Sequence, residues 1–362
     1  MGAKVYFTTT HAAPGAGLLH KTETLFQQAN LAGLIKERDL VALKIHFGER
    51  GNTAFIPPIY ARRVVEKVKA AGGRPFLTDA NTLYVGGRSN AVSHMATAVQ
   101  NGFSYATVEA PVIIADGLTG KDFEEIDIAQ KHFKKVRVAS AAVHADAMIA
   151  LTHFKGHEMT GFGGAIKNIG MGLGCRSGKQ QMHADVKPRV DVAKCVACGK
   201  CSRWCATHAI KVVGERAEID LKKCQGCGEC IVTCPEQAIA IDWGRDSGAL
   251  QEKIAEYALG AIKDKSGKVG FISFIMNITP DCDCWGYSAE ALLPDIGIAA
   301  STDPVALDQA CVDLVNQAAG RDVFRGVHKH VDWEVQLAYG EEIGLGGRDY
   351  ELVRLDDAGG LK

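Results

Sequence analysis

Two runs of cysteine carry the clearest chemistry of this 362-residue chain. CVACGKCSRWC begins at Cys195 and CQGCGECIVTC begins at Cys224, and both have the spacing C-x2-C-x2-C-x3-C. The runs start 29 positions apart, and an Ala-Ile pair follows each run at the same offset, so the segment is an internal duplication. Thiolates are the soft ligands that hold iron in a cluster. The runs therefore predict two iron–sulfur clusters. Structural zinc sites are the weaker alternative, because zinc motifs rarely repeat such a dense run.

The duplicated segment resembles the bacterial two-cluster ferredoxin, in which the fourth cysteine of each run binds the other cluster. The resemblance implies two 4Fe–4S clusters. Cluster one would take Cys195, Cys198, Cys201 and Cys234. Cluster two would take Cys224, Cys227, Cys230 and Cys205. The proline that follows the fourth cysteine is present as Pro235 and replaced by Ala206 in the first copy, which removes no ligand. Eight basic and seven acidic residues between positions 189 and 242 nearly cancel, which favours a built-in relay over a carrier with a charged docking face.

The composition is that of a soluble globular protein, with 47% hydrophobic and 23% charged residues. Lysine plus arginine is 41 and aspartate plus glutamate is 42, so charge gives no reason to expect nucleic acid or a membrane as partner. The N-terminus lacks the apolar run of a signal peptide, and no apolar stretch is long enough to span a bilayer. We therefore predict a cytoplasmic protein whose partner is a redox protein or a small-molecule substrate; the sequence leaves the oligomeric state open.

Outside residues 189–242 the pattern predicts an α/β fold, a mostly parallel sheet with helices on both faces. Near-continuous apolar runs indicate buried strands at residues 41–48, 74–80, 110–117, 147–154, 269–278 and 295–301. Helical patterns cover residues 56–73, 246–263 and 302–320, where Asp303-Pro304 is typical of a helix start. We expect one α/β domain from residues 1–188 and 243–362, interrupted by a ferredoxin-like α+β domain at 189–242, and a polar tail from 353 to 362.

Residues that bind metals or move protons follow five of the expected strands. They are His46, Asp79, the pair His153 and His157, the pair Cys282 and Cys284, and the run from Ser301 to Asp303. Because parallel strands end at one edge of a sheet, where ligands bind in open α/β folds, these residues predict an active site separate from the clusters. Asp79 would bind substrate or relay protons there.

Cys282 and Cys284 lie in the sequence DCDC, and side chains two apart on an extended chain share a face. Two thiolates on one face suit iron, zinc or a cluster edge, and this favours a third metal centre. Its further ligands would come from Cys175, His153, His157 and His183. The alternative is that these cysteines are buried like apolar residues, as we expect for Cys311 within a helix.

The stretch GFGGAIKNIGMGLG contains Lys167 and six glycines whose spacing matches neither a P-loop nor a dinucleotide-binding loop. The glycines either permit close helix–sheet packing or leave amides bare for an anionic ligand. A lysine among small and apolar residues is costly to bury without a partner, so we favour a functional Lys167 that supplies a charge or a nucleophilic amine.

Taken together, the chain resembles a family of uncharacterised iron–sulfur-centre proteins, in which a two-cluster ferredoxin interrupts a domain of unknown function. The motifs that carry this resemblance are THFKGHEMTGFGGAIKNIGMG, QMHAD, the eight-cysteine segment and ITPDCDC. A fainter similarity is to lactate racemase, where a histidine, a lysine and a later histidine serve a nickel pincer cofactor. That similarity implies His157 as acid/base, Lys167 as cofactor tether and His183 as nickel ligand, although the cysteines are not part of the racemase pattern.

Three functions follow from these patterns. The first is an iron–sulfur oxidoreductase or electron-transfer protein, with clusters that feed a metal or substrate site at the sheet edge. The second is a non-catalytic electron carrier or metallocentre-assembly factor, which predicts clusters without turnover. The third is a racemase-like or isomerase-like enzyme, which predicts nickel or an adduct on Lys167.

Overall fold

A large sheet forms the centre of the molecule in the computed structural model, which describes residues 2–84, 86–183, 188–205, 207–224, 229–236, 238–240 and 247–356. Its strands are β1 (Ala3–Thr9), β2 (Leu40–Ile45), β3 (Arg74–Asp79), β4 (Val112–Ile114), β7 (Ala147–His153), β14 (Val269–Ile275), β15 (Gly297–Ser301) and β16 (Tyr350–Arg354). Their order is β16-β1-β15-β14-β7-β2-β3-β4. Of the pairings in this sheet, the two made by β15 are antiparallel and the others are parallel. The expected α/β class with a mostly parallel sheet is confirmed.

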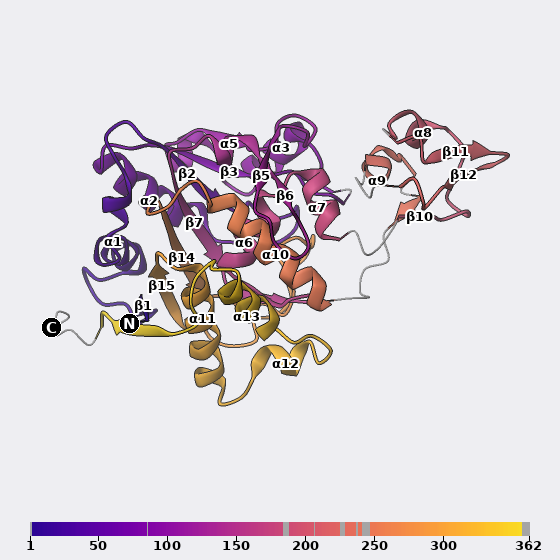
Figure 1. Cartoon of the computed structure of the whole chain (residues 1–362). Helices are drawn as coiled ribbons and strands as arrows, with labels where there is room; N and C mark the ends of the chain where they lie inside the picture. The colour runs from indigo at the N-terminus through magenta and orange to yellow at the C-terminus, as the bar shows by residue number, and fades with distance from the viewer. Residues whose placement is uncertain are drawn as a thin grey trace.

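Helices cover both faces of the sheet (Figure 1). One core contains side chains of α6 (Ala165–Leu173), α10 (Ser247–Ile262), α11 (Pro304–Ala319) and α13 (Glu334–Glu342). The other contains side chains of α1 (Leu18–Gln28), α2 (Pro58–Ala70), α3 (Ala91–Gln100) and α4 (Tyr105–Val108). Within β7, Met148 and Ala150 face the first core, whereas Ile149 and Leu151 face the second, as the alternation of a strand buried on both faces requires. No helix in the ranges given above is long and apolar enough to cross a membrane.

Local sequence signals set the ends of the predicted helices. Pro58 opens α2, and Gly72, with φ of 87°, follows its end in a left-handed conformation that favours glycine. The Asp303 carboxylate accepts hydrogen bonds from the amides of Val305 and Ala306 at the start of α11. Asp303-Pro304 therefore starts this helix in the way that the sequence predicts.

Shorter elements connect the main layers. They are η1 (Leu31–Leu34), β5 (Phe123–Asp127), β6 (Lys135–Ala139), α5 (Ser140–Val143), β8 (Lys155–His157), β9 (Gly161–Gly163), α7 (Arg176–Met182) and α12 (Val323–Val327). The antiparallel hairpin β8–β9 stands directly between β7 and α6. The glycine-rich stretch is thus a strand end, a hairpin and a helix in succession.

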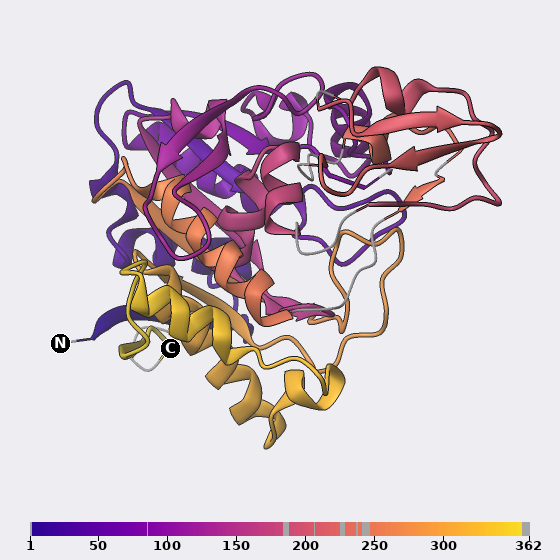
Figure 2. The same ribbon diagram turned by 45° about the vertical axis from the view of Figure 1, so that its right-hand side comes forward.

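The cysteine-rich segment lies to one side of the sheet (Figures 1 and 2). Its elements are β10 (Arg189–Val190), α8 (Lys200–Arg203), β11 (Ile210–Val213), β12 (Arg216–Ile219), α9 (Glu229–Thr233) and β13 (Ile239–Ala240). Equivalent backbone hydrogen bonds show the duplication. The Asp191 amide donates to the Ala238 carbonyl and the Asp220 amide donates to the Ala209 carbonyl, both at 2.7 Å. Each copy therefore binds the other through equivalent residues, about a local pseudo-two-fold relation.

Two expectations about the C-terminal part are wrong. Since β15 runs antiparallel to β14, its end at Ser301 lies opposite Phe271, away from the edge where β14 ends. Ser301 to Asp303 therefore take no part in the predicted active site. Val353 and Arg354 do not belong to a polar tail, because they pair with β1 as part of strand β16. Residues 357–362 of that expected tail lie outside the described ranges.

Gly170 tests whether the glycines of α6 serve packing. A Cβ atom there would stand 2.3 Å from the Ile254 carbonyl oxygen of α10, a backbone atom that has little freedom to move. We expect Gly170→Ala to lower the free energy of unfolding by about 1–3 kcal/mol through overpacking. Gly17→Ala is the matched control, because nothing lies within 4 Å of its added Cβ. Equal urea midpoints for the two variants would show that α6 and α10 do not depend on this contact.

Candidate functional site

A group of four side chains, which we call the thiol centre, lies beyond the carboxyl ends of β7 and β14. It consists of Cys282, Cys284, Lys167 and His157. The Lys167 Nζ atom is 3.6 Å from the Cys282 Sγ atom. Cys284 has the largest influence on the pKa of the Cys282 thiol, and Lys167 and His157 also lower that pKa. The two cysteines lie in a loop seven and nine residues beyond the end of β14 at Ile275. The sequence predicts that they share a face of an extended chain, whereas both lie in this loop rather than in a strand.

The segment after β7 brings two members of the thiol centre to this loop. His157 ends β8, and Lys167 is the third residue of α6. The hairpin touches the loop directly: Gly156 donates to the Thr279 carbonyl at 2.8 Å. A Cβ at Gly156 would lie only 2.2 Å from the Pro280 carbonyl oxygen, so glycine is needed for this approach. The close packing holds His157 and Lys167 against Cys282.

Asp283, between the two cysteines, anchors the loop to the sheet edge. Its carboxylate lies 2.9 Å from the His153 Nδ1 atom and 3.5 Å from the Lys155 Nζ atom. The other nitrogen of His153, Nε2, lies 3.0 Å from the Met276 carbonyl oxygen. Both nitrogens of His153 thus face oxygen atoms of the protein. His153 positions the loop through these contacts, and this role takes the place of the predicted role as a metal ligand.

The electrostatics of the thiol centre separate the two cysteines. The hydrogen bond from Cys284, with Lys167 and His157, outweighs burial and holds the pKa of Cys282 well below its usual range. The same hydrogen bond and burial raise the pKa of Cys284 well above its usual range. Burial lowers the pKa of Lys167, but the neighbouring thiols outweigh it, so the net pKa is raised. The centre therefore favours a thiolate at Cys282, beside the Lys167 ammonium, over one at Cys284.

His183 follows α7 as its C-cap residue and belongs to the surroundings of the thiol centre. Burial, together with the charges of His157 and Lys167, lowers the pKa of His183 to about 3, so its imidazole is neutral. Cys175 does not join it, because its buried sulfur caps the start of α7 and accepts from the Gly178 amide at 3.4 Å. Cys311 is fully buried in the core on α11, as predicted.

Asp79 lies in a buried ion network rather than in the thiol centre. Its carboxylate is 3.1 Å from the Lys44 Nζ atom and 3.5 Å from an Arg88 nitrogen. Burial alone would raise the pKa of Asp79, but Lys44 with His46, His94 and Arg88 outweighs it and holds the pKa well below the ordinary value. A carboxylate that stays ionised is a poor proton relay near neutral pH. We therefore treat Asp79 as a structural counter-ion.

The start of α6 is not an open anion cradle. The Asp308 carboxylate of α11 accepts hydrogen bonds from the Ala165 amide at 2.6 Å and from the Ile166 amide at 2.9 Å. A Cβ at Gly164 would lie 2.3 Å from this carboxylate, so the glycine makes room for the protein's own acid. The prediction that bare amides bind an anionic ligand is wrong here. Lys167 remains a candidate functional residue because of its contact with Cys282.

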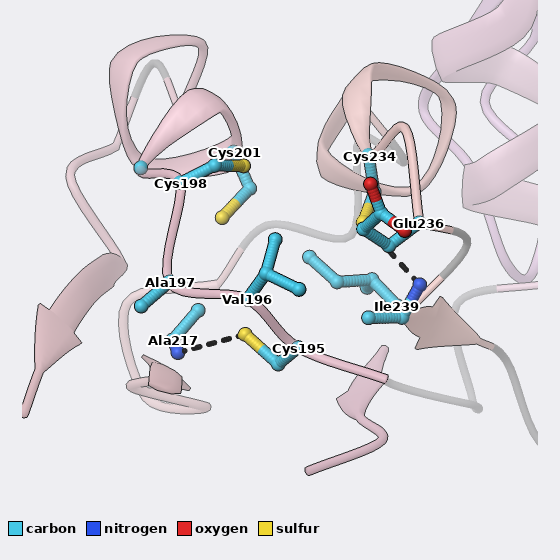
Figure 3. A pocket seen from close by; sticks show the side chains of 11 residues that line it. Cys195, Val196, Ala197, Cys198, Cys201, Ala217, Cys234, Glu236 and Ile239 are labelled. Carbon is cyan, nitrogen blue, oxygen red and sulfur yellow. Dashed lines mark hydrogen bonds between the residues drawn. The ribbon is translucent and has the colours of Figure 1, made fainter. Parts of the chain in front are cut away.

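Cysteines from both repeats line one cavity in the duplicated segment (Figure 3). The cavity opens to solvent, and the space within it, open solvent included, is about 330 Å³. The cysteines in its wall are Cys195, Cys198, Cys201 and Cys234, the set assigned to cluster one. Backbone amides donate to three cysteine sulfurs of the segment: Ala217 to Cys195 and Ala238 to Cys234, both at 3.3 Å, and Ala209 to Cys205 at 3.2 Å. Hydrogen bonds of this kind suit sulfurs that carry negative charge.

The second set of cysteines is described in part. Cys205 and Cys230 are buried in the small core of the segment, and Cys224 packs against it. Cys227 lies outside the described residues. Throughout the described ranges, no three His, Cys, Asp or Glu side chains gather as a site for a single metal ion. A metal bound by Cys282, Cys284 and His183 stays a prediction.

Comparison with known proteins places the chain in a family. The domain of unknown function DUF362 matches residues 41–313, which is most of the chain. The chain belongs to the DUF362 family. This DUF362 match runs across residues 189–242. No protein with a curated description matches the chain.

Two solved structures are similar to this DUF362 protein. The lactate racemase apoprotein from Thermoanaerobacterium thermosaccharolyticum is 11% identical with a TM-score of 0.36, and the match covers 97% of this chain and 82% of that one. A protein from Thermotoga maritima is 10% identical with a TM-score of 0.42, covering 86% of this chain and 61% of that one. Both likenesses are too distant to carry a functional argument.

Sequence reasoning missed several residues that build the site of this DUF362 protein. Asp283 stands inside the DCDC motif, but its role as anchor depends on contacts with β7 and β8. The sequence could have indicated a role for Lys44, because a lysine inside an apolar strand needs a buried partner. Tyr84, which donates to the Cys284 carbonyl at 3.1 Å, and Arg88, which pairs with Glu49, lie in a loop with no periodic signal.

Lys167→Met provides a test of the ion pair in the thiol centre. Loss of the ammonium should raise the pKa of Cys282 towards its ordinary value of 9.0, because a neighbouring cation stabilises the thiolate. The pH profile of Cys282 alkylation by iodoacetamide, read by peptide mass spectrometry, should therefore move to higher pH. Lys135→Met removes an exposed lysine and is the control. An unmoved profile in the Lys167 variant would remove the lysine from the account of Cys282.

Proposed function

We propose that this protein is an iron–sulfur oxidoreductase in which residues 189–242, as an inserted ferredoxin-like domain, hold two 4Fe–4S clusters and exchange electrons with the thiol centre. The observation that carries the proposal is the cavity of the duplicated segment. Three of its cysteines come from the first run, and Cys234 comes from the second. Such an exchange between the runs is what a two-cluster ferredoxin requires of its ligands.

The donor set suits an iron–sulfur cluster better than a single ion. Four sulfurs around one cavity leave room for a group with several metal atoms, each with its own thiolate. Amide hydrogen bonds reach Cys205 and Cys234 from residues four positions later in both copies. Cys195, Cys198, Cys201 and Cys234 would hold one cluster, and Cys205, Cys224, Cys227 and Cys230 the other. Each cluster supplies one-electron transfer.

A short connection joins the two parts of the proposed path. Leu83 of the α/β domain is buried in the same cluster of side chains as Cys201, Cys205 and Cys230. The next residue, Tyr84, donates its hydroxyl hydrogen bond to the carbonyl of Cys284. One residue of the main domain thus packs against the cluster-bearing segment while its neighbour holds the thiol centre. This contact supports a built-in relay rather than a segment that works alone.

The experiment is metal and sulfide analysis of the full chain, purified without oxygen. The proposal predicts about eight iron and about eight sulfide per chain for two cubane clusters. The Cys311→Ala variant should give the same values, since this cysteine is buried in the core of the main domain. Stoichiometric zinc with little sulfide would contradict the proposal. Clusters without any redox turnover would instead favour an electron carrier or an assembly factor.

One observation favours a second candidate, a nickel-pincer racemase or isomerase. His157 and Lys167 both lie near enough to His183 for their charges to lower its pKa, in keeping with the similarity to the racemase pattern. Against it, the amine of Lys167 is engaged by the Cys282 sulfur. This candidate predicts nickel in the purified protein and a mass excess on the Lys167 peptide. Absence of both from active protein would remove it.

A further inference from the structure

The two cysteines of the thiol centre are arranged for reaction with each other. One residue separates them in the chain, and both lie in one tight turn, in which the Trp285 amide donates to the Cys282 carbonyl at 3.1 Å. Each of the two thiols has the largest influence on the pKa of the other. Cys282 is 3% exposed, while Cys284 is partly exposed. Burial protects Cys282 from bulky thiols and oxidants, so the sulfur within its reach is that of Cys284. The Asp283 anchor fixes the backbone between them without occupying either sulfur.

Lys167 makes this pair a poor site for an added cation. Its Nζ atom is 3.6 Å from the Cys282 sulfur, and a metal ion on that sulfur would meet the ammonium at short range in a buried place. Like charges at such distances repel strongly where water is excluded. The same ammonium stabilises a thiolate, which is the form of cysteine that attacks or leaves in disulfide chemistry. The charge pattern thus favours sulfur chemistry over metal binding.

We propose that Cys282 and Cys284 form a redox-active pair that stores two electrons by opening and closing an intramolecular disulfide. On oxidation, the Cys282 thiolate sulfur bonds to the Cys284 sulfur, the S–H bond of Cys284 breaks, and two electrons and one proton leave. The clusters, held by the eight cysteines of the duplicated segment, would supply one-electron acceptors for these electrons, and an external one-electron carrier protein would be the final oxidant; reduction of the disulfide would take up two electrons and one proton. This inference rests on the proposed function, because the clusters link one-electron carriers to a two-electron site.

The test uses full-length protein purified without oxygen and divided into a ferricyanide-oxidised and a dithionite-reduced sample. Each sample is quenched in acid, unfolded, alkylated and digested, and the peptide that contains Cys282 and Cys284 is weighed. The oxidised peptide should carry no alkyl group and be about 2 Da lighter than the free dithiol, whereas the reduced peptide should carry two alkyl groups. Cys311, buried in the core, should be alkylated once in both samples.

A redox titration of the same peptide adds a second readout. A two-electron couple changes its ratio of disulfide to dithiol tenfold for about 30 mV. The Cys284→Ser variant should abolish the mass shift and leave Cys282 alkylated in both samples, while its iron and sulfide stay unchanged. A pair that is alkylated twice in the oxidised wild type would overturn the inference. Stoichiometric metal that is present in the wild type and lost in Cys284→Ser would also overturn the inference.

Failure of the inference is distinguishable from failure of the proposed function. Iron and sulfide are counted on the same samples as the thiols. Two clusters with a permanently reduced pair would overturn the dithiol inference and leave the proposed function standing. A chain without clusters would overturn the proposed function, and with it the electron supply that the inference requires.

Discussion

Replacing Asp79 by alanine should lower the free energy of unfolding by about 3–5 kcal/mol, because the change leaves buried cations without their counter-ion. Asp79 is 2% exposed, and both Lys44 and Arg88 lie within 3.5 Å of its carboxylate. Lys44 is fully buried, and burial lowers its pKa to about 8 even with Asp79 present. Without that carboxylate, Lys44 must lose its proton or draw water into the core.

Urea unfolding followed by circular dichroism measures this loss. Asp127→Ala is the matched control, because Asp127 forms an exposed ion pair with Lys135 at 3.5 Å and should cost less than about 1 kcal/mol. The double variant Asp79→Ala with Lys44→Met should recover part of the loss, since both charges of the pair are removed together. An Asp79→Ala variant as stable as the Asp127 control would contradict the assignment of Asp79 as a buried counter-ion.

The loss caused by Asp79→Ala should also depend on pH in a defined direction. The folded state holds the pKa of Asp79 well below the ordinary value of 3.8. A carboxyl group with a depressed pKa contributes stability above its unfolded pKa and loses that contribution as the pH falls through the folded pKa. The gap between wild type and variant should therefore be full above about pH 4 and should shrink in more acidic solution.

Cys234→Ala should remove one complete cluster, although Cys234 belongs to the second cysteine run. The reason is geometric, since Cys234 lines the same cavity as Cys195 and Cys198 of the first run. Iron should fall from about eight to about four per chain. The remaining cluster should be the same one that survives in Cys195→Ala. Cys205→Ala should instead leave the other cluster, so its electron paramagnetic resonance spectrum should differ from those two.

Identifying which cluster each variant loses tests the ligand assignment more directly than the iron count alone. In the two-cluster ferredoxin arrangement, Cys234 lies in the second run but binds the cluster of the first run. Two independent four-cysteine sites would not show this exchange. Cys311→Ala controls for general damage, because that cysteine is buried in the core of the main domain. If Cys234→Ala and Cys224→Ala lost the same cluster, the exchange of ligands between the runs would be wrong.

Much of the fold could be predicted because its signals are local. Strand β7 is fully buried along its length, and its continuous apolar run indicates this directly. The expectation that β15 ends at the same edge as β14 is wrong. The sequence held a sign of the antiparallel direction, because residues 276–296, which connect the two strands, contain no helix. Parallel neighbours need a long crossover, usually helical, so a connection without a helical pattern favours an antiparallel return.

The sequence predicts which residues belong to the site better than it predicts the contacts among them. Lys167, His157 and the two cysteines of DCDC stood out by residue type and position, and the structure brings them together. Side-chain pairs such as His153 with Asp283 join residues 130 positions apart, and no periodicity encodes that choice. Asp308 at the start of α6 is similar, because it reaches those amides from α11. Such contacts depend on how layers pack, which one sequence does not specify.

The most direct measurement of the central claim is spin quantitation of the full-length protein after anaerobic reduction with dithionite. An insert with two 4Fe–4S clusters predicts about two unpaired electrons per chain at low temperature, with signals broadened by interaction between neighbouring clusters. Cys234→Ala should reduce this to about one and remove the broadening. A reduced wild-type protein with no cluster signal would contradict the account, because the thiol centre would then have no internal source of electrons.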